Sequence, residues 1–420
     1  MSQSSKQVQP KYNIGGVFLR LISIGGKFLL VMFIAKYMTL EELGIYGLFV
    51  VTSNLVMYVL GFEFYGYATR ELIKHDASSR SQIVWNQGLF HSVAYLIIMP
   101  LIISVFWLNV LPWTLVVWFY LVLVGTHISQ ELTRILIAVS RPLAAYVVAA
   151  GTHGFWVFPV VLLMVIEPNF RTLNFILGTW AIAGLLSSVA GIFYLKKIGL
   201  LEFKAVSTDW SWVIKGLKIC WIFFIISLCY QVIALSDRYF IQFFLGEASV
   251  GVYTFFVSIA RVLQDIISTG ITAVLFPLLV ASYHNADVES WRLHIKQMTR
   301  DVTIATVLLF PLFIIGIYIL LPLLGKEQFY QELTSYIILL VSSAILNLAL
   351  IPHYILYARR ADLPLLYATL SGAILNVILN CILVPFYGIM GAAIATSISF
   401  AFMAMLKLIY SFKYNLYELK

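Results

Sequence analysis

The chain has 420 residues, of which 61% are hydrophobic and 11% charged, and its mean hydropathy is +0.94. This composition excludes a soluble globular protein, because such proteins carry charge on about a quarter of their residues. The formal net charge of +8 is spread over short loops and matches a lipid surface, so a nucleic-acid partner is excluded. The three cysteines lie in apolar stretches without pairing or ligand spacing, so neither a disulfide framework nor a metal site is predicted.

The first apolar stretch, residues 13–36, is long enough to cross a bilayer but contains Arg20 and Lys27. The two cations are seven residues apart and therefore lie on nearly one face of a helix. A charged side chain near the bilayer centre costs at least about 2.5–3.5 kcal/mol on insertion scales. We therefore expect this face to line a cationic cavity and to avoid contact with lipid.

Uncharged runs further along the chain predict helical hairpins, because helices satisfy their own backbone groups in lipid. No Asp, Glu, Lys or Arg occurs between Arg80 and Glu131, and a turn at 109–112 divides this run. Residues 363–406 are also uncharged, with a turn at 385–388. An all-α polytopic membrane protein with about twelve spans is predicted, the spans lying at 13–36, 44–66, 83–108, 113–139, 143–166, 172–195, 213–244, 250–280, 298–323, 333–357, 363–385 and 388–412.

The distribution of Lys and Arg between alternate loops predicts the orientation of the chain. One set of loops holds only Lys36, Arg171 and Lys326. Both termini are therefore expected to be cytoplasmic, and the polar start carries no pattern of a cleavable signal. The opposite set of loops and span ends holds Lys6, Lys11, Arg70, Lys74, Arg80, Arg141, Lys196, Lys197, Lys204, Lys215, Lys218, Arg292, Lys296, Arg300, Arg359, Arg360, Lys407, Lys413 and Lys420.

A short motif near the start of the second predicted span recurs half a chain later. Leu43-Gly44-Ile45-Tyr46 corresponds to 250–253, and the shift that takes Gly44 to Gly251 is 207 residues in a chain of 420. Transporters are often built from repeated halves. We therefore predict two six-helix lobes, residues 1–200 and 201–420, joined by a basic linker.

Two longer stretches resemble polysaccharide repeat-unit flippases of the multidrug/oligosaccharidyl-lipid/polysaccharide exporter superfamily. One is residues 376–396, with Asn376, Asn380 and Gly388, and the other is residues 237–253. The resemblance covers essentially the whole chain in length, number of spans and order of motifs.

The resemblance implies a V-shaped exporter fold and a transporter, not an enzyme, without cofactors. Such a protein would flip undecaprenyl-pyrophosphate-linked oligosaccharides of O-antigen, lipopolysaccharide or exopolysaccharide biosynthesis across the bacterial inner membrane by alternating access. Polysaccharide polymerase and chain-length proteins would be further partners.

Recognition of a pyrophosphate requires fixed positive charge in a cavity of low dielectric. The candidate substrate-binding residues are the cations of the first, seventh and eighth spans: Arg20, Lys27, Arg238 and Arg261. In the alternative interpretation each cation is neutralised by a carboxylate and only holds helices together. That interpretation is strongest for Arg261, because Asp265 lies one helical turn away.

Ionisable residues in the fourth span are candidates for a gate or a coupling site. His127, Glu131 and Arg134 follow one another at helical spacing, and a purely structural Glu–Arg pair is the alternative. Asp237 and Asp265 are further candidates for coupling or gating.

Other polar residues within the spans are expected to be structural. His91, His153 and His353 are expected to be isolated core histidines with satisfied hydrogen bonds, and Asn376 and Asn380 to bond between helices.

Two other functions remain open. A cation-coupled extruder of small compounds on the same fold would require a cavity dominated by acidic groups, whereas the predicted cavity is basic. A membrane glycosyltransferase or polymerase would require an acidic pair in a sizeable outer loop. Glu41 and Glu42 are the one candidate pair, and their loop is short.

Overall fold

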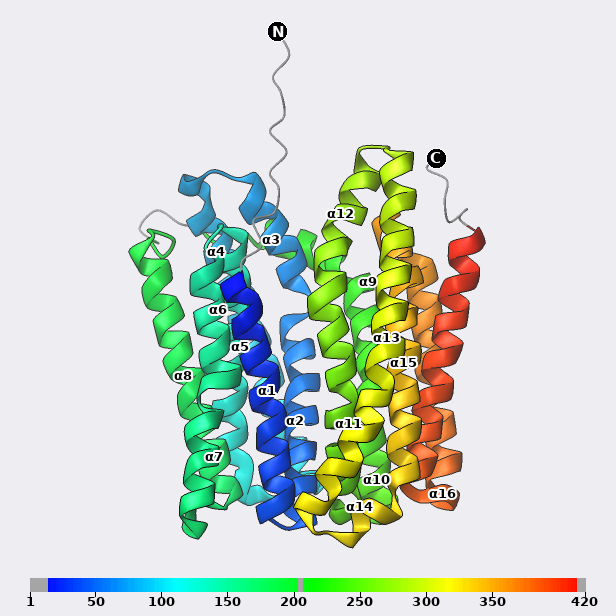
Figure 1. Cartoon of the computed structure of the whole chain (residues 1–420). Helices are drawn as coiled ribbons and strands as arrows, with labels where there is room; N and C mark the ends of the chain where they lie inside the picture. Colours follow the sequence, from blue (N-terminus) through cyan, green and yellow to red (C-terminus); the bar gives the residue numbers. More distant parts are fainter. Residues whose placement is uncertain (1–13, 203–206, 414–420) are drawn as a thin grey trace.

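The structure, a computed structural model, describes residues 14–202 and 207–413, which form a bundle of long helices (Figure 1). In this view the start of α1 and the end of α16 lie at the upper end of the bundle, and α10 and α14 lie at the lower end. The first-half helices are α1 (Ile14–Tyr37), α2 (Leu40–Gly61), α3 (Phe64–Lys74), α4 (Ala77–Trp107), η1 (Trp113–Leu115), α5 (Val116–Ala138), α6 (Pro142–Ala150), η2 (Gly151–Phe155), α7 (Val157–Ile166), η3 (Pro168–Phe170) and α8 (Leu173–Lys197). The second-half helices are α9 (Trp210–Leu235), α10 (Asp237–Leu245), α11 (Glu247–Ile267), η4 (Ser268–Thr272), α12 (Ala273–His284), α13 (Val288–Leu324), α14 (Glu327–Gln331), α15 (Leu333–Ala358) and α16 (Asp362–Lys413).

The all-α membrane fold is confirmed. Ten segments of the described chain are long and apolar enough to span a membrane. The longest of them, α16, contains two crossings, and α1 adds one, which accounts for the twelve predicted spans. Several helices extend beyond the predicted spans: α13 begins at Val288 instead of residue 298. The hydropathy signal ends with the membrane, whereas backbone hydrogen bonding continues into the polar extension.

The turn between the last two crossings depends on two glycines. Gly388 has φ 59° and ψ −138°, a conformation that strongly favours glycine, and it separates the two crossings within α16. A Cβ atom at Gly391 would overlap with the carbonyl group of Leu383 on the other side of the turn. The predicted turn at 385–388 is therefore confirmed, and the two crossings pack closely from its first residues onward.

The two halves meet where α2 crosses α11. A Cβ atom at Gly44 would overlap with the carbonyl oxygen of Glu247, and a Cβ atom at Gly251 would overlap with that of Leu40. The same shift of 207 residues that relates Gly44 to Gly251 also relates Leu40 to Glu247. The contact is therefore approximately symmetric, and it joins the repeated motifs that the sequence indicated.

Polar contacts support this crossing at the lower end of the bundle. Lys326, in the turn between α13 and α14, donates a hydrogen bond to the carbonyl oxygen of Met38 at the α1–α2 turn. Partial burial lowers the pKa of Lys326, while Glu41 and Glu42 nearby oppose that shift. Gln242 of α10 donates to the carbonyl oxygen of Val110 at 3.1 Å, so α10 is also joined to the turn after α4.

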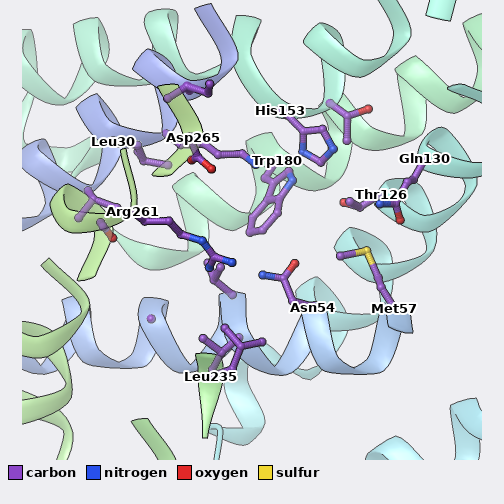
Figure 2. A pocket seen from close by; sticks show the side chains of 18 of the residues that line it. Leu30, Asn54, Met57, Thr126, Gln130, His153, Trp180, Leu235, Arg261 and Asp265 are labelled. Atoms are coloured by element: carbon purple, nitrogen blue, oxygen red, sulfur yellow. The ribbon is translucent and has the colours of Figure 1, made fainter. Parts of the chain in front are cut away.

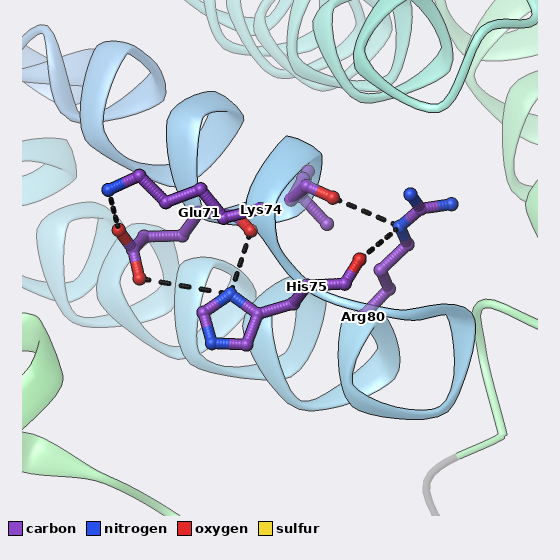
Figure 3. A network of polar contacts seen from close by, with 5 residues as sticks. Glu71, Lys74, His75 and Arg80 are labelled. Atoms are coloured by element: carbon purple, nitrogen blue, oxygen red, sulfur yellow. Dashed lines mark hydrogen bonds and ion pairs between the residues drawn. The ribbon is translucent and has the colours of Figure 1, made fainter. Parts of the chain in front are cut away.

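At the upper end, basic side chains satisfy the end of α3 (Figure 3). Arg80 Nε donates to the carbonyl oxygens of Leu72 and His75 at 3.0 and 3.1 Å, and Lys74 pairs with Glu71 at 3.2 Å. The last carbonyl groups of a helix have no partner within the helix. Arg80 therefore has a structural role at the end of α3 in addition to its value as an orientation signal.

Candidate functional site

A cavity of about 410 Å³ lies between the two halves of the chain. Its wall is formed by α1, α2, α5 and the η2 region from one half and by α9, α10 and α11 from the other. Figure 2 shows Arg261 and Asp265 on one side, His153, Trp180 and Thr126 on another, and Asn54 projecting from α2. The cavity is thus polar on several sides and lies between spans that a membrane would surround.

Three of the predicted substrate-binding cations line this cavity: Lys27, Arg238 and Arg261. Lys27 is exposed to the cavity from the middle of α1, whereas Arg238 is only 4% exposed. Among the described residues, no carboxylate lies within 4.0 Å of the side-chain nitrogens of these cations. The alternative interpretation, in which Asp265 neutralises Arg261, is therefore not supported by an ion pair, although both residues line the cavity.

A close approach between α1 and the fifth span determines the position of Lys27. A Cβ atom at Gly26 would lie 3.3 Å from the carbonyl oxygen of Gly154, which belongs to the π-helical turn η2. A π-turn within an α-helix is uncommon and is often found at functional sites. The turn carries His153, and both His153 and Lys27 line the cavity.

Arg134 lines the same cavity but is already paired. Its guanidinium group bonds to Glu131 of the same helix and lies 3.7 Å from the centre of the Tyr65 ring. Glu131 itself is buried behind the wall. Arg20 lies in α1, and its side chain is outside the described residues.

A second cavity, of about 710 Å³, adjoins the first. Both are lined by Tyr58, Glu63, Tyr65 and Gln231. The helix breaks here, because Phe62 and Glu63 have left-handed backbone angles, φ 48° and 55°. The prediction of one continuous second span over residues 44–66 is therefore wrong at this point. The break instead directs Glu63 into both cavities.

Several aromatic side chains line the second cavity. The rings of Phe223, Tyr230, Tyr354 and Tyr357 contribute to its wall together with Lys407. Lys407 is 4% exposed and lies in the last crossing of α16. The larger cavity is therefore more apolar than the first, with a basic group at its margin.

Asp237 lies apart from the main cavity in a polar cluster of the second half. It accepts hydrogen bonds from the hydroxyl groups of Tyr253 and Thr396 and from Asn380 Nδ2, the last at 2.9 Å. Ser236 Oγ donates to Asn376 Oδ1 at 3.0 Å. The expected interhelical role of the two asparagines is confirmed, and Asp237 is held at the junction of four helical segments.

The histidines differ from expectation. His91 is not isolated: its Nε2 atom lies 3.4 Å from Glu131 Oε2, and neither ring nitrogen forms a hydrogen bond among the described residues. Sequence spacing within one span could not detect this contact, because His91 and Glu131 lie on different helices. Trp156 and Trp180 were not predicted as site residues, yet both line the main cavity from mid-span positions.

Comparison with known proteins gives a family and a fold. Residues 144–418 match the family described as lipid II flippase MurJ. No curated protein matches the chain.

Three solved structures have the same overall fold as this chain. An inward-facing multidrug resistance MATE family transporter of the MOP superfamily is 13% identical with a TM-score of 0.75, covering 95% of this chain and 98% of that one. A lipid II flippase MurJ in an inward closed conformation is 14% identical with a TM-score of 0.63, covering 94% and 86%. A Vibrio cholerae MATE transporter is 12% identical with a TM-score of 0.62, covering 96% of each chain. The predicted V-shaped exporter fold is confirmed.

Proposed function

From the premise that this chain belongs to the MurJ lipid II flippase family, we propose that it flips undecaprenyl-pyrophosphate-linked oligosaccharide repeat units by alternating access. Membership makes the chain a multi-pass membrane transporter, not an enzyme. The substrate proposal adds that the cargo is an O-antigen or exopolysaccharide unit, in the bacterial inner membrane, with both termini cytoplasmic. It is supported by the motif resemblance at 237–253 and 376–396 and by the asymmetry of loop charges.

The observation that carries the proposal is the charge of the main cavity. Four cationic side chains line it, Lys27, Arg134, Arg238 and Arg261, against the two carboxylates of Glu63 and Asp265. Anionic oxygens bind strongly to such groups, and guanidinium groups bind phosphate through paired hydrogen bonds. An anionic lipid headgroup therefore fits this cavity better than a cationic drug.

The rival function is a cation-coupled extruder of small compounds. The specific observation in its favour is the likeness to MATE transporters, which establishes the fold alone. An extruder of cations would bind its substrate more tightly in a cavity whose carboxylates outnumber its basic groups, and here the basic groups outnumber the carboxylates.

We also propose Asp237 and the His127–Glu131–Arg134 group as the coupling or gating residues of the flippase, with Asp265 as a further candidate at the cavity wall.

Replacing Lys27 or Arg261 with alanine is expected to lower the rate of headgroup translocation about ten- to a hundredfold, because a hydrogen bond to a charged group contributes about 1.5–3 kcal/mol. The measurement uses purified protein in liposomes with a polyprenyl-pyrophosphate oligosaccharide that carries a fluorescent headgroup. A membrane-impermeant quencher then reports the fraction facing outward. Lipid II is assayed in parallel, because faster translocation of lipid II would contradict the proposed oligosaccharide cargo.

Lys36→Ala is the matched control, since Lys36 is an exposed lysine at the end of the same helix. It should translocate at the wild-type rate. Normal translocation by a folded variant that lacks both Lys27 and Arg261 would contradict the role of the cavity. The extruder would be favoured if the wild type moves no headgroup and if both the wild type and that variant export a cationic dye.

A further inference from the structure

A cluster of metal-ligating groups lies inside the first half of the chain, behind the cavity wall. His91 of α4 and His127 and Glu131 of α5 are 8%, 1% and 6% exposed. One ligand atom of each residue lies within 4.8 Å of the ligand atoms of the other two. None of the three lines either of the two large cavities, so the cluster is distinct from the proposed substrate site.

Three of the four ring nitrogens of this cluster form no hydrogen bond among the described residues. Both nitrogens of His91 and Nε2 of His127 are buried without a hydrogen bond among the described residues. A buried polar group without a partner costs about 1–3 kcal/mol. Such groups call for an explanation when several occur together, and a role as ligands of an ion is one.

Neighbouring side chains orient the ligand atoms in the way that metal sites require. Tyr95 Oη lies 2.7 Å from His127 Nδ1, so that His127 Nε2 is the nitrogen left as a ligand atom. Gln87 Nε2 donates to Glu131 Oε2 at 2.8 Å, and Arg134 bonds to the other oxygen, Oε1. A histidine ligand usually donates its second nitrogen to a neighbouring oxygen, and carboxylate ligands are also held by hydrogen bonds.

We propose that His91, His127 and Glu131 bind a divalent transition-metal ion of the zinc class. Two imidazoles and one carboxylate, with a fourth position for water, form a known zinc ligand set. His91 Nε2 and Glu131 Oε2 are 3.4 Å apart, close to the edge of about 3.3 Å that a tetrahedron with bonds of about 2.0–2.1 Å requires. The imidazole pair favours zinc or its transition-metal neighbours over magnesium or calcium, which prefer oxygen ligands.

The charges of the site permit this assignment. Arg134 contacts only Oε1 of Glu131, so Oε2 keeps a lone pair for the ion. Gln87 Oε1 is also buried without a partner, which leaves an acceptor beside the cluster.

The position of the cluster connects it to the helix break at the cavity. A Cβ atom at Gly61 would lie 3.8 Å from His127 Nε2, and Gly61 immediately precedes the left-handed residues Phe62 and Glu63. A bound ion would join α4 to α5 directly behind this break. It would therefore stabilise the first lobe next to the segment that carries Glu63 into both cavities.

The test is a titration of the purified full chain, treated with a chelator, in detergent. We expect one Zn²⁺ per chain to bind tightly and to raise Tm, while Mg²⁺ at the same concentration does not, because a ligand of the folded state stabilises it. His91→Gln and His127→Gln should each weaken Zn²⁺ binding by more than about tenfold. Tyr95→Phe should weaken Zn²⁺ binding about 10–100-fold, although it removes no ligand atom.

The control is His353→Gln, a half-buried histidine whose Nδ1 atom has no hydrogen bond and which belongs to no group of three metal-ligating side chains among the described residues. It should bind Zn²⁺ as the wild type does. One further variant carries both His91→Gln and His127→Gln. If this double variant folds and binds Zn²⁺ with the affinity of the wild type, the ion is an adventitious ion only, held by surface histidines, and the proposal fails. Absence of any Zn²⁺-dependent change in Tm of the wild type also overturns it. Neither result depends on translocation, so the substrate proposal is tested separately.

Discussion

The Gly44→Ala variant is expected to lose most of its transport activity and to shift towards states in which α2 and α11 separate. The added methyl group would overlap with the Glu247 carbonyl group on the facing helix, a backbone atom that cannot rotate away. Inserting a methyl group into a packed contact costs about 1–3 kcal/mol, which changes an equilibrium about 5- to 150-fold. The shift is measured as the distance between spin labels at Glu41 and Ser249 in protein whose native cysteines are replaced by serine.

Gly251→Ala should have the same effect, because its methyl group would overlap with the Leu40 carbonyl group. Gly88→Ala is the matched control: it lies within α4, and no atom lies within 4 Å of its Cβ position. An unchanged distance distribution in folded Gly44→Ala protein would show that the crossing does not have to be this close.

The Asp237→Ala variant is expected to lose about 2–5 kcal/mol of stability, since it leaves the donors of Tyr253, Thr396 and Asn380 without their shared acceptor. Asp237→Asn should lose less, because it keeps one oxygen and the shape of the side chain. Thermal unfolding of the purified chain in detergent measures both variants.

Asp301→Ala serves as the control, because Asp301 is a partly exposed carboxylate that pairs with its neighbour Arg300. Such exposed pairs contribute about 0–1 kcal/mol. Equal unfolding temperatures for Asp237→Ala and Asp301→Ala would mean that the buried network contributes nothing to the fold.

Much of the fold could be predicted from the sequence, because each crossing has a local signal. The uncharged runs at 81–130 and 363–406 and the turn at Gly388 are visible in a single stretch of chain. The break at Phe62–Glu63 could not be predicted, because neither residue type favours a left-handed backbone, so the surrounding packing must impose it. The boundary between lobes at residue 200 remains a prediction.

The candidate site was predictable in part for the same reason. Lys27, Arg238 and Arg261 attract attention because each is a charge in an apolar stretch, and all three reach one cavity. The contact between His91 and Glu131 could not be predicted, since it depends on which faces of α4 and α5 meet. Lys407 was treated only as a loop-charge signal, because it lies near a predicted span end, yet it lines the second cavity.

The crossing of α2 and α11 also bears on how such a chain arises. One shift relates Leu40 to Glu247, Gly44 to Gly251 and Gly47 to Thr254. Gly44 approaches Glu247 while Gly251 approaches Leu40, and Gly47 approaches its own counterpart Thr254. A surface in which residue i meets j while j meets i is the isologous contact of a two-fold homodimer. A six-helix ancestor that paired with its own copy would present this surface. After fusion of the two copies, each half can diverge freely except near the two-fold axis between α2 and α11. There, each substitution alters the surroundings of the residue 207 positions away in the other half.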